Sequence, residues 1–278
     1  MAYIILKHVH IRNANAFNGI AAGFPAITAW AGAVHNLQRI INEKITEPFV
    51  IYNFAVSCHH YEYQAHRNTR YDNYELSIPR LTCKSNGQAR SIIPQMHIHL
   101  DVSIALNVDI ESNNIDITNI IKDTLLYMRI AGGTVDYVKD VIFFANNIDE
   151  YDNVDIKVLR ALMPGYVLVE SELLKDNNIP GDALDRLLNI LSVDRNTYKR
   201  EYDGWLVPNI VGFKKIVDIH NSTCINARDM NTPNVFVEPV IKLCEFKMPI
   251  RFDNMDSILW EYCYEDGLYF CSINVSKD

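Results

Sequence analysis

The clearest pattern in the chain lies in residues 95–108, where hydrophobic and polar positions alternate. The hydrophobic positions are Met96, Ile98, Leu100, Val102, Ile104 and Leu106, and the polar positions include Gln95, His97, His99, Asp101, Ser103 and Asn107. A period of two is typical of a strand that buries one face and leaves the other open. Residues 95–108 are therefore predicted to form a strand whose open face carries two histidines.

Three further strands are predicted in the first half of the chain, at residues 3–12, 49–63 and 134–145. They are rich in the β-branched and aromatic residues that favour strands. In residues 3–12 the even positions share one face and turn polar at His8 and His10. Lys7 interrupts the hydrophobic positions of the other face.

Two helices are predicted between these strands. In residues 25–43, large hydrophobic residues recur three or four positions apart, which is the spacing of a helix with one buried face. Pro25 suits the first helical position because its fixed φ angle fits there. Residues 117–130 show similar periodicity, and Gly132 and Gly133 are predicted to end that helix.

The predicted order is strand, helix, strand, strand, helix, strand. It indicates an α+β protein with a ferredoxin-like, RNA-recognition-type β-α-β-β-α-β core. Residues 1–145 are expected to form this RNA-binding domain, with a thumb-like insertion at about residues 64–94 between the second and third strands. Because the first and third strands are central neighbours in this topology, the four histidines His8, His10, His97 and His99 are expected to meet on the open face of the sheet.

Residues 146–278 are predicted to form a mixed α/β region packed on the first domain. Residues 166–170 predict a strand, and residues 180–191 predict a helix with leucines on one side. From residue 198 onward, short strand-like runs alternate with turn signals. No flexible linker separates this region from the first domain.

The predicted helix at residues 25–43 has a second stripe, made of Thr28, Gly32, His35 and Arg39. Two of these side chains are basic or can become so, and a glycine lets another molecule approach the backbone closely. A Gly- and Asn-rich loop that contains Asn13, Asn15 and Asn18 precedes the helix. Unpaired N–H groups at a helix N-terminus attract anions, so this loop and helix are a candidate anion site.

Charge is distributed unevenly along the chain. The net charge is -8, which by itself argues against nucleic acid. The first 100 residues, however, hold 9 Lys and Arg against 5 Asp and Glu, and the remainder holds 17 against 29. Because salt screens charges beyond about 10 Å, a basic N-terminal half can bind a polyanion although the whole chain is acidic.

Targeting and nucleotide-binding signals are not found. The N-terminus does not resemble a signal peptide, and no hydrophobic run approaches the roughly 18 residues that a membrane span needs. The six cysteines include no C-x-x-C pair, so we expect reduced thiols in a soluble, cytoplasmic protein without membrane contact. No phosphate-binding loop and no nucleophile elbow is present, which leaves nucleotide hydrolysis without support.

Basic and aromatic residues are interleaved in the first half of the chain. The basic residues are Arg12, Arg39, Arg67, Arg70, Arg80, Lys84, Arg90 and Arg129, and the aromatic residues are Tyr61, Tyr63, Tyr71 and Tyr74. Single-stranded RNA suits such a surface, because cations hold phosphates and rings stack on bases. A solvated surface loop explains the same residues equally well.

The histidine pairs allow three interpretations. A metal site would need three or four converging ligands, and only Asp101 joins His97 and His99 on their face. Metal-free acid–base cleavage of RNA suits the pKa of histidine. The simplest interpretation is a set of imidazoles that hydrogen-bond on a half-exposed sheet. Trp205 is expected in the core, and Arg228 with Asp229 can brace a turn.

Several blocks of the sequence, taken together, resemble one known family. The blocks are Asn13-Ala14-Asn15-Ala16, Gly23-Phe24-Pro25, Val34-His35-Asn36-Leu37-Gln38-Arg39, Arg129-Ile130-Ala131-Gly132-Gly133, Gly204-Trp205-Leu206-Val207-Pro208 and Asn226-Ala227-Arg228-Asp229, the last followed by Thr232-Pro233. In this order they are similar to the second Csy subunit, the Cas-five-type protein, of type I-F CRISPR surveillance complexes (Cascade). The chain is shorter than typical members between Leu174 and Trp205.

The resemblance implies a non-catalytic subunit without cofactor or metal that binds the 5′ handle of the CRISPR RNA. Such a subunit pairs with the large (first) Csy subunit and abuts the repeated backbone (third) Csy subunit, and the assembled complex base-pairs with invading target DNA. The insertion at residues 64–94 resembles a thumb that pins the RNA. Charge and placement select Arg12, Asn13, Asn15, His35, Arg39, Arg67, Arg70, Arg90, Arg129 and Arg228 as candidate RNA-binding residues.

Two other functions stay open from the sequence. One is a metal-independent CRISPR endoribonuclease that uses the strand histidines. The other is a protein–protein scaffold whose acidic C-terminal half does the binding.

Overall fold

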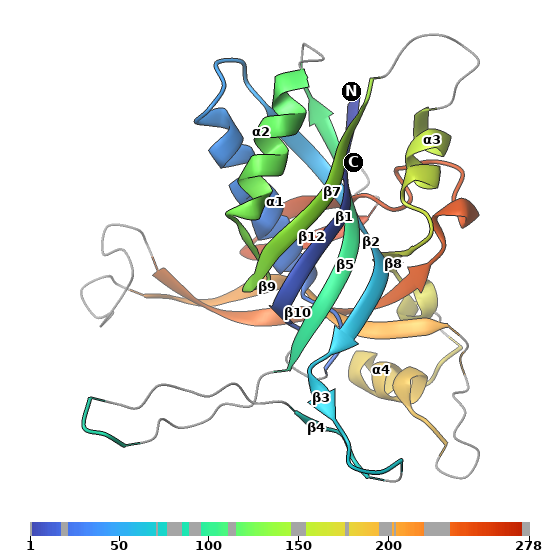
Figure 1. Ribbon diagram of the computed structural model, residues 1–278. Helices are drawn as coiled ribbons and strands as arrows, with labels where there is room; N and C mark the ends of the chain where they lie inside the picture. The colour runs from blue at the N-terminus through green and yellow to red at the C-terminus, as the bar shows by residue number, and fades with distance from the viewer. Residues whose placement is uncertain are drawn as a thin grey trace.

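The computed structural model describes residues 2–17, 22–70, 72–76, 85–88, 96–110, 115–145, 154–175, 178–194, 202, 204–219 and 234–273. Within these ranges the protein is an α+β structure built on one ten-stranded sheet, in which every pair of neighbouring strands is antiparallel (Figure 1). None of the helices in these ranges combines the length and hydrophobicity needed to cross a membrane.

The first half of the chain supplies two helices and the central strands. Its elements are β1 (Ala2–Asn15), α1 (Ile27–Asn42), β2 (Val50–Tyr63), β3 (Ala65–His66), β4 (Glu75–Leu76), β5 (His97–Asp109), α2 (Ile115–Leu126), β6 (Arg129–Ile130) and β7 (Gly133–Phe144). The long strands lie in the order β2-β5-β1-β7, so β1 and β5 are central neighbours as predicted. The short strands β3 and β4 pair with each other beyond the end of β2 (Figure 1).

The second half of the chain extends the same sheet. Its elements are α3 (Val154–Ala161), β8 (Tyr166–Glu170), η1 (Glu172–Lys175), α4 (Ala183–Leu191), β9 (Trp205–Ile219), β10 (Asn234–Lys247), η3 (Pro249–Arg251), β11 (Trp260–Glu265) and β12 (Leu268–Ile273). The sheet continues from β2 through β8, β10, β9 and β12 to β11, and β11 also pairs with β2. These six strands therefore form a closed circuit of pairings.

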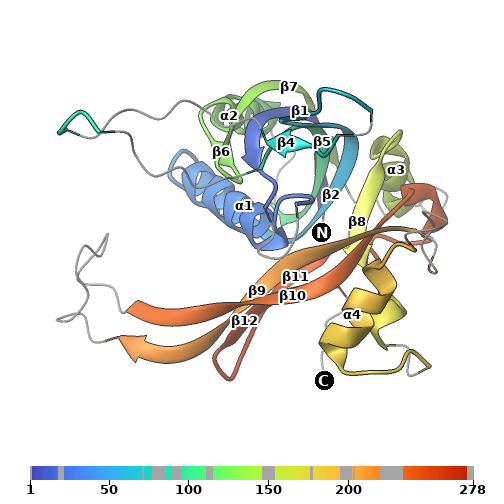
Figure 2. The same ribbon diagram turned by 90° about the horizontal axis from the view of Figure 1, so that it is seen from below.

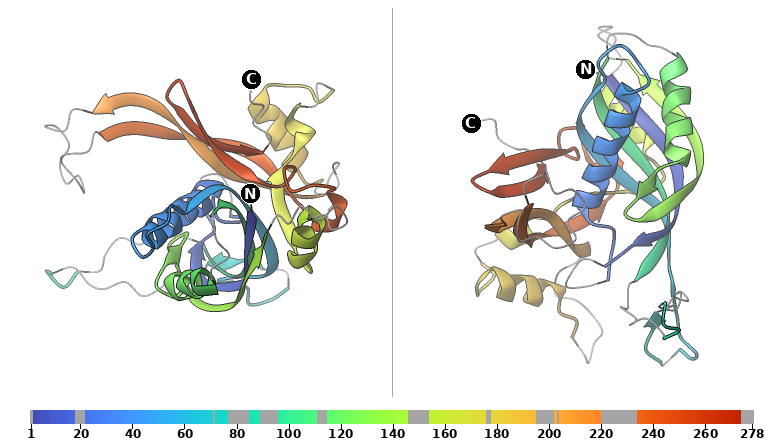
Figure 3. Two further views of the ribbon diagram at one scale, coloured as in Figure 1. Left: turned by 90° about the horizontal axis from the view of Figure 1, so that it is seen from above. Right: turned by 90° about the vertical axis from the view of Figure 1, so that its left-hand side faces the viewer.

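Strands β9 and β10 differ from the short strands predicted for this region. They contain 15 and 14 residues, pair along nearly their whole length and project to one side as a long ribbon (Figures 2 and 3). The prediction of short strands was wrong because the turn signals before residue 234 do not interrupt either strand. Gly212 lies inside β9, where a Cβ atom would collide with the Tyr269 carbonyl oxygen of β12.

Hydrophobic side chains fill both faces of the first-half strands. The larger cluster lies between the sheet and helices α1 and α2, and it includes Ile4, Leu6, Val9, Ile11, Trp30, Leu37, Leu100, Ile121 and Leu125. It also takes in Leu168, Val207, Phe246 and Trp260 from the second half, so the two halves share one core. A smaller cluster on the opposite face packs Ile5, Ala55 and Ala105 under α3 and residues 255–259 (Figure 3).

The alternation of faces predicted for β1 is wrong, because a β-bulge interrupts the strand. Leu6 lies opposite Ile104, but Val9 lies opposite Val102, so two residues of β1 stand against one residue of β5. The extra residue reverses the alternation, because a one-residue shift moves every later side chain to the other face. Ile4 and Leu6 therefore share the helix-side core with Val9, and the open face receives His8.

Helix boundaries also differ from the prediction. Helix α1 begins at Ile27 rather than at Pro25. Helix α2 ends at Leu126, before the glycines that were expected to stop it: Gly132, with a φ angle of 79°, lies in the turn between β6 and β7, and Gly133 begins β7. A Cβ atom on Gly133 would lie 2.7 Å from the Ala14 amide nitrogen, so this glycine lets β7 approach β1 closely.

Candidate nucleic-acid interface

A polar cluster occupies the part of the open sheet face that α3 does not cover. It begins with the bulge of β1, where His8 takes a φ angle of 47°, a conformation that non-glycine residues rarely adopt. The His8 amide donates a hydrogen bond of 3.1 Å to Ser103 Oγ of β5. The bulge is thus held by a side chain and not by the regular ladder of the sheet.

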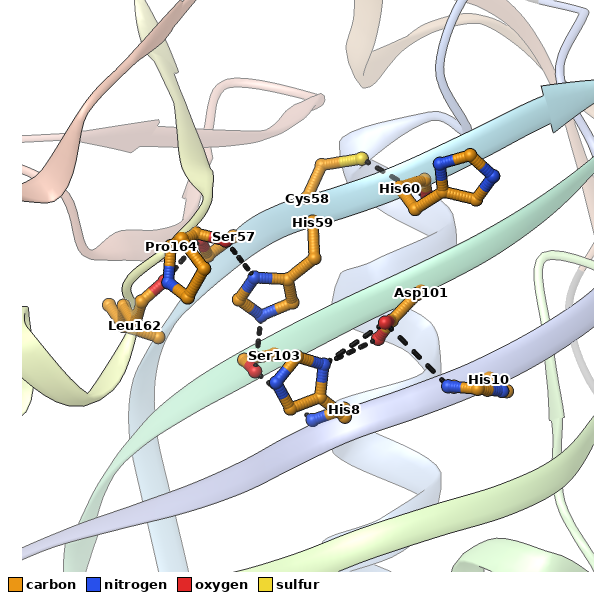
Figure 4. Close-up of polar contacts among 10 residues, drawn as sticks. All are labelled: His8, His10, Ser57, Cys58, His59, His60, Asp101, Ser103, Leu162 and Pro164. Atoms are coloured by element: carbon orange, nitrogen blue, oxygen red, sulfur yellow. Dashed lines mark hydrogen bonds and ion pairs between the residues drawn. The ribbon is translucent and has the colours of Figure 1, made fainter.

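Asp101 joins the two histidines of β1 (Figure 4). His8 Nδ1 lies 3.0 Å from both carboxylate oxygens, and His10 Nε2 lies 3.6 Å from one of them. The Asp101 side chain is 21% exposed, so the carboxylate is partly shielded from water. The prediction that four histidines meet holds for His8 and His10, which Asp101 of β5 brings together, whereas His99 Nδ1 accepts the Asn13 amide instead.

His59 of β2 extends the cluster toward the second half of the chain. Its ring centroid lies 4.3 Å from that of His8. His59 Nδ1 lies 2.5 Å from the Pro164 carbonyl oxygen, and Nε2 lies 2.6 Å from Ser103 Oγ. Because a carbonyl oxygen only accepts, Nδ1 carries the hydrogen, and Nε2 accepts from the Ser103 hydroxyl. Burial lowers the pKa of His59, although the Pro164 carbonyl opposes this shift.

The chemistry available to this cluster is limited by burial. Ser103, His59 and the Pro164 carbonyl have the order of a nucleophile, a base and the group that orients the base. Ser103, however, is fully buried, and its oxygen already accepts the His8 amide. In the described part of the chain, no group of three or more potential ligands is arranged to hold a metal ion. The cluster therefore braces three strands and presents imidazole edges on the sheet surface.

Four predicted RNA-binding residues gather where β1 ends. Arg12 lies opposite Thr134 of β7, and Arg129 of β6 lies opposite the same threonine. Asn15 is close by, since its amide donates to the Ala131 carbonyl oxygen at 2.9 Å. Arg12 forms an ion pair with Asp136, and its side chain is 71% exposed. We call Arg12, Asn13, Asn15 and Arg129 the β1-end cluster.

Asn13 and Asn15 lie in β1 and not in the loop that was predicted for them. A second bulge, between Ile11 and Ala14, explains the difference. Asn13 adopts a φ angle of 57° there, and its amide donates to His99 Nδ1 at 3.1 Å. Asparagine tolerates the left-handed region better than most residues, so an Asn-rich run is compatible with a bulged strand.

The other candidates lie on three different parts of the chain. His35 and Arg39 are exposed on α1, but Arg39 is near the start of β2, since its neighbour Gln38 accepts the Ile51 amide at 2.9 Å. Arg67 and Arg70 belong to the insertion after β2, where the Arg67 guanidinium lies 4.8 Å from the Tyr74 ring centroid. Arg90 and Arg228 lie outside the described residues.

The predicted anion site at the start of α1 is contradicted by the structure. The Ile27 amide donates to Asn209 Oδ1 of β9 at 2.8 Å, and both residues are fully buried. Asn209 Nδ2 donates to the Pro25 carbonyl oxygen at 3.2 Å. A side chain of the protein therefore occupies the place that an anion would take. The glycine of the second stripe, Gly32, faces open space as expected.

Sequence reasoning missed three residues that shape this surface. Ser103 holds the β1 bulge, Asp136 pairs with Arg12, and Asn209 closes the end of α1. The interruption of the β1 pattern at Lys7 was a signal of the bulge. Nothing in the sequence indicates that Asn209 contacts a helix 182 residues away.

Comparison with known proteins identifies the family. The family model described as CRISPR-associated protein (Cas_Csy2) matches residues 4–271 of the chain. The chain is also 25% identical to a protein named CRISPR-associated protein Csy2 from Pseudomonas aeruginosa (strain UCBPP-PA14), over 96% of this chain and 94% of that protein. The family match covers every element from β1 to β12. The chain therefore belongs to the Csy2 family of CRISPR-associated proteins.

Proposed function

We propose that the chain is a non-catalytic subunit of a type I-F CRISPR surveillance complex, in which it binds the 5′ handle of the CRISPR RNA. The observation that carries this proposal is the family match across residues 4–271. The subunit pairs with the large Csy subunit, abuts the repeated backbone subunit and reaches target DNA only through the assembled cytoplasmic complex.

The architecture of the first half supports RNA binding. Its long strands lie in the order β2-β5-β1-β7, with α1 connecting β1 to β2 and α2 lying between β5 and β7 along the chain. This order supports a ferredoxin-like, RNA-recognition-type domain, which we propose for residues 1–145. The thumb would comprise residues 64–94, of which β3 and β4 form the described base.

The placement of positive charge supports the same function. β2 runs into the thumb at the end of the sheet where the β1-end cluster lies, because Tyr63 and Ala14 both stand opposite Ile98. Cations of the cluster and of the thumb therefore line one end of the sheet. An RNA backbone held there would neutralise them.

Exposed hydrophobic side chains on the β9–β10 ribbon support a protein partner. Ile216 and Val217 lie at a bulge of β9 and are both more than half exposed. Phe236 on β10 is 62% exposed. Apolar patches of this kind mark interaction surfaces, which agrees with pairing to another subunit.

The salt dependence of RNA binding tests the proposal. The full chain is co-purified with its partner subunits and titrated with handle RNA at several salt concentrations. Replacing Arg67 and Arg70 by alanine should weaken binding and reduce the slope of log K against log salt by roughly 1 to 1.5, since about 0.7 is lost per phosphate contact to a single strand.

A matched control uses Arg251, an exposed arginine of η3 outside the proposed interface. Arg251→Ala removes a single charge of the same kind and should leave both the affinity and the slope unchanged. If the Arg67 and Arg70 variant behaves like this control, the thumb does not hold phosphates and the proposal is wrong about the surface.

One observation favours the rival function of an endoribonuclease. The His8–Asp101 pair resembles a base with its orienting carboxylate. Incubation of the purified chain, without its partner subunits, with labelled repeat RNA in EDTA separates the two functions. The proposal predicts intact RNA, whereas cleavage that His8→Ala abolishes would establish the rival.

A further inference from the structure

Three aromatic side chains meet on the surface beside the thumb. The Tyr61 and Trp205 ring centroids lie 5.5 Å apart, and those of Tyr166 and Trp205 lie 5.8 Å apart. The exposed fractions of Tyr61, Tyr166 and Trp205 are 37%, 43% and 41%. They come from β2, β8 and β9, so three strands from both halves of the chain build one aromatic surface. We call these three residues the aromatic platform.

The platform is fixed from below by buried rings. Trp205 contacts Phe246 with a centroid distance of 4.9 Å, and Phe246 contacts Phe24 at 5.2 Å. Phe24 stacks on Trp30 of α1 at 5.6 Å. The inner part of Trp205 is thus held by the core, while 41% of the residue remains open to solvent. The sequence predicted that Trp205 lies in the core, but only the inner side of this residue is buried there.

The position of the platform connects it to the proposed RNA path. Tyr61 is followed by Tyr63 at a centroid distance of 5.2 Å, and the chain then enters the thumb. The Gln64 amide still donates to the His97 carbonyl oxygen at 2.8 Å, so the sheet extends to the base of the thumb. The thumb arginines Arg67 and Arg70 therefore follow the platform within a few residues.

We propose that the aromatic platform is a stacking site for unpaired RNA bases whose phosphates are held by the thumb arginines. This inference rests on the proposed RNA-binding function and adds the site that receives the bases. Every base has a π-face, so stacking on Trp and Tyr contributes affinity without sequence readout. The Tyr61 and Tyr166 hydroxyl groups add hydrogen-bonding edges that an aliphatic surface would lack. The nearby arginines favour a polyanion over an apolar protein segment.

Tryptophan fluorescence provides a direct test. The sequence has three tryptophans, and Trp30 and Trp260 are 1% and 0% exposed, so only Trp205 can stack on a base. The full chain, co-purified with its partners, is titrated with a short oligoadenylate. Stacking should quench the component of the emission that belongs to this chain, identified as the signal that Trp205→Phe removes. An abasic oligomer of the same length should bind through its phosphates without quenching.

Affinity measurements separate the platform from the general RNA surface. Trp205→Ala should weaken handle binding by about tenfold or more, whereas Trp205→Phe should retain most of the affinity. Matched melting temperatures of the two variants would show that both are folded. Tyr166→Leu, compared with Tyr166→Phe, repeats the test at a ring that does not contact Phe246.

Each outcome has a distinct meaning. If the ring-deleting variants bind RNA like the wild type while the Arg67 and Arg70 variant loses affinity, the platform is not a base site but the proposed function stands. If they bind RNA normally but lose a partner subunit, the platform is a protein contact and the inference is overturned. If the complex binds RNA equally well with any variant, with the wild-type chain or without the chain, the proposed function itself fails.

Discussion

At the scale of single residues, the open sheet face depends on close packing around His59. Its two ring nitrogens contact Ser103 and Pro164, and its ring lies against His8. A neutral imidazole satisfies both contacts, because one nitrogen donates and the other accepts. Protonation would place a second N–H against Ser103 and a charge in a half-buried site.

The stability of the folded chain should therefore depend on pH through His59. Its pKa is lowered from the usual value of 6.5, so the unfolded chain binds the proton first as pH falls. The stability that the neutral His59 imidazole contributes is fully present above pH 6.5. It is lost as the pH falls from 6.5 toward the pKa of His59 in the folded chain. His8, Asp101 and Lys7 face the same site and modulate the effect.

Thermal unfolding of wild type and His59→Gln at pH values from about 7.5 to about 5 measures this dependence. The wild-type melting temperature should fall more steeply with acid than that of the variant. If the melting temperatures of the two proteins fall in parallel with pH, His59 is not held neutral in the folded chain.

Gly165 packs against the same site and should not tolerate a side chain. A Cβ atom there would lie 2.5 Å from Ser57 Oγ and 2.8 Å from His59 Nδ1. Gly165→Ala should destabilise the protein by about 1–3 kcal/mol, the usual cost of overpacking. Gly32→Ala is the matched control, since it meets nothing within 4 Å and lies in a helix. It should stabilise the protein by about 0.5–1 kcal/mol. Urea unfolding measures the free energy of unfolding of both variants. Equal changes in the two variants would contradict the close packing around Gly165.

At the scale of elements, α1 lacks a cap from its own sequence. Ala26 occupies the N-cap position and provides no side-chain hydrogen bond. The buried Asn209 of β9 supplies the acceptor for Ile27 and donates to the Pro25 carbonyl oxygen. The N-terminus of α1, in the first half of the chain, is thus capped by a side chain of β9, in the second half.

Asn209→Ala should consequently destabilise the chain by about 1–3 kcal/mol, because it leaves buried backbone groups unpaired. Asn36→Ala, at a half-exposed amide on the same helix, should change stability by less than about 0.5 kcal/mol. The midpoint of urea unfolding reports both changes. A similar small shift for the two variants would show that the cap does not hold α1.

At the scale of the whole molecule, the two halves are joined through β2 and a shared core, and a polar contact braces the second half. Glu170 of β8 accepts from Lys242 at 2.8 Å and from Ser272 at 2.6 Å. These residues belong to β8, β10 and β12, so one carboxylate links three strands of the closed circuit. The shared core and the pairing of β2 with β8 and β11 agree with the lack of a predicted linker between the halves.

The sequence was most informative where one period governs a whole element. The alternation in β5 and the periodicity of α1 predicted their helix-side faces correctly, because each packs on one continuous core. The other face of β5, which was predicted to stay open, is buried as well from Ser103 to Asn107, because the second cluster covers it. The bulge residue His8 could not be predicted, since its conformation depends on Ser103, which lies 95 positions away. Likewise, the partial burial of Trp205 depends on its contact with Phe246 of β10, 41 positions away, which the local pattern does not indicate.

The central claim is that the chain touches the CRISPR RNA handle through the thumb and the β1-end cluster. Photo-crosslinking of handle RNA to the assembled complex, followed by peptide mapping, tests it most directly. The proposed function predicts crosslinked peptides from residues 64–94 and from the end of β1. Crosslinks confined to other parts of the chain, or RNA attached only to partner subunits, would contradict it.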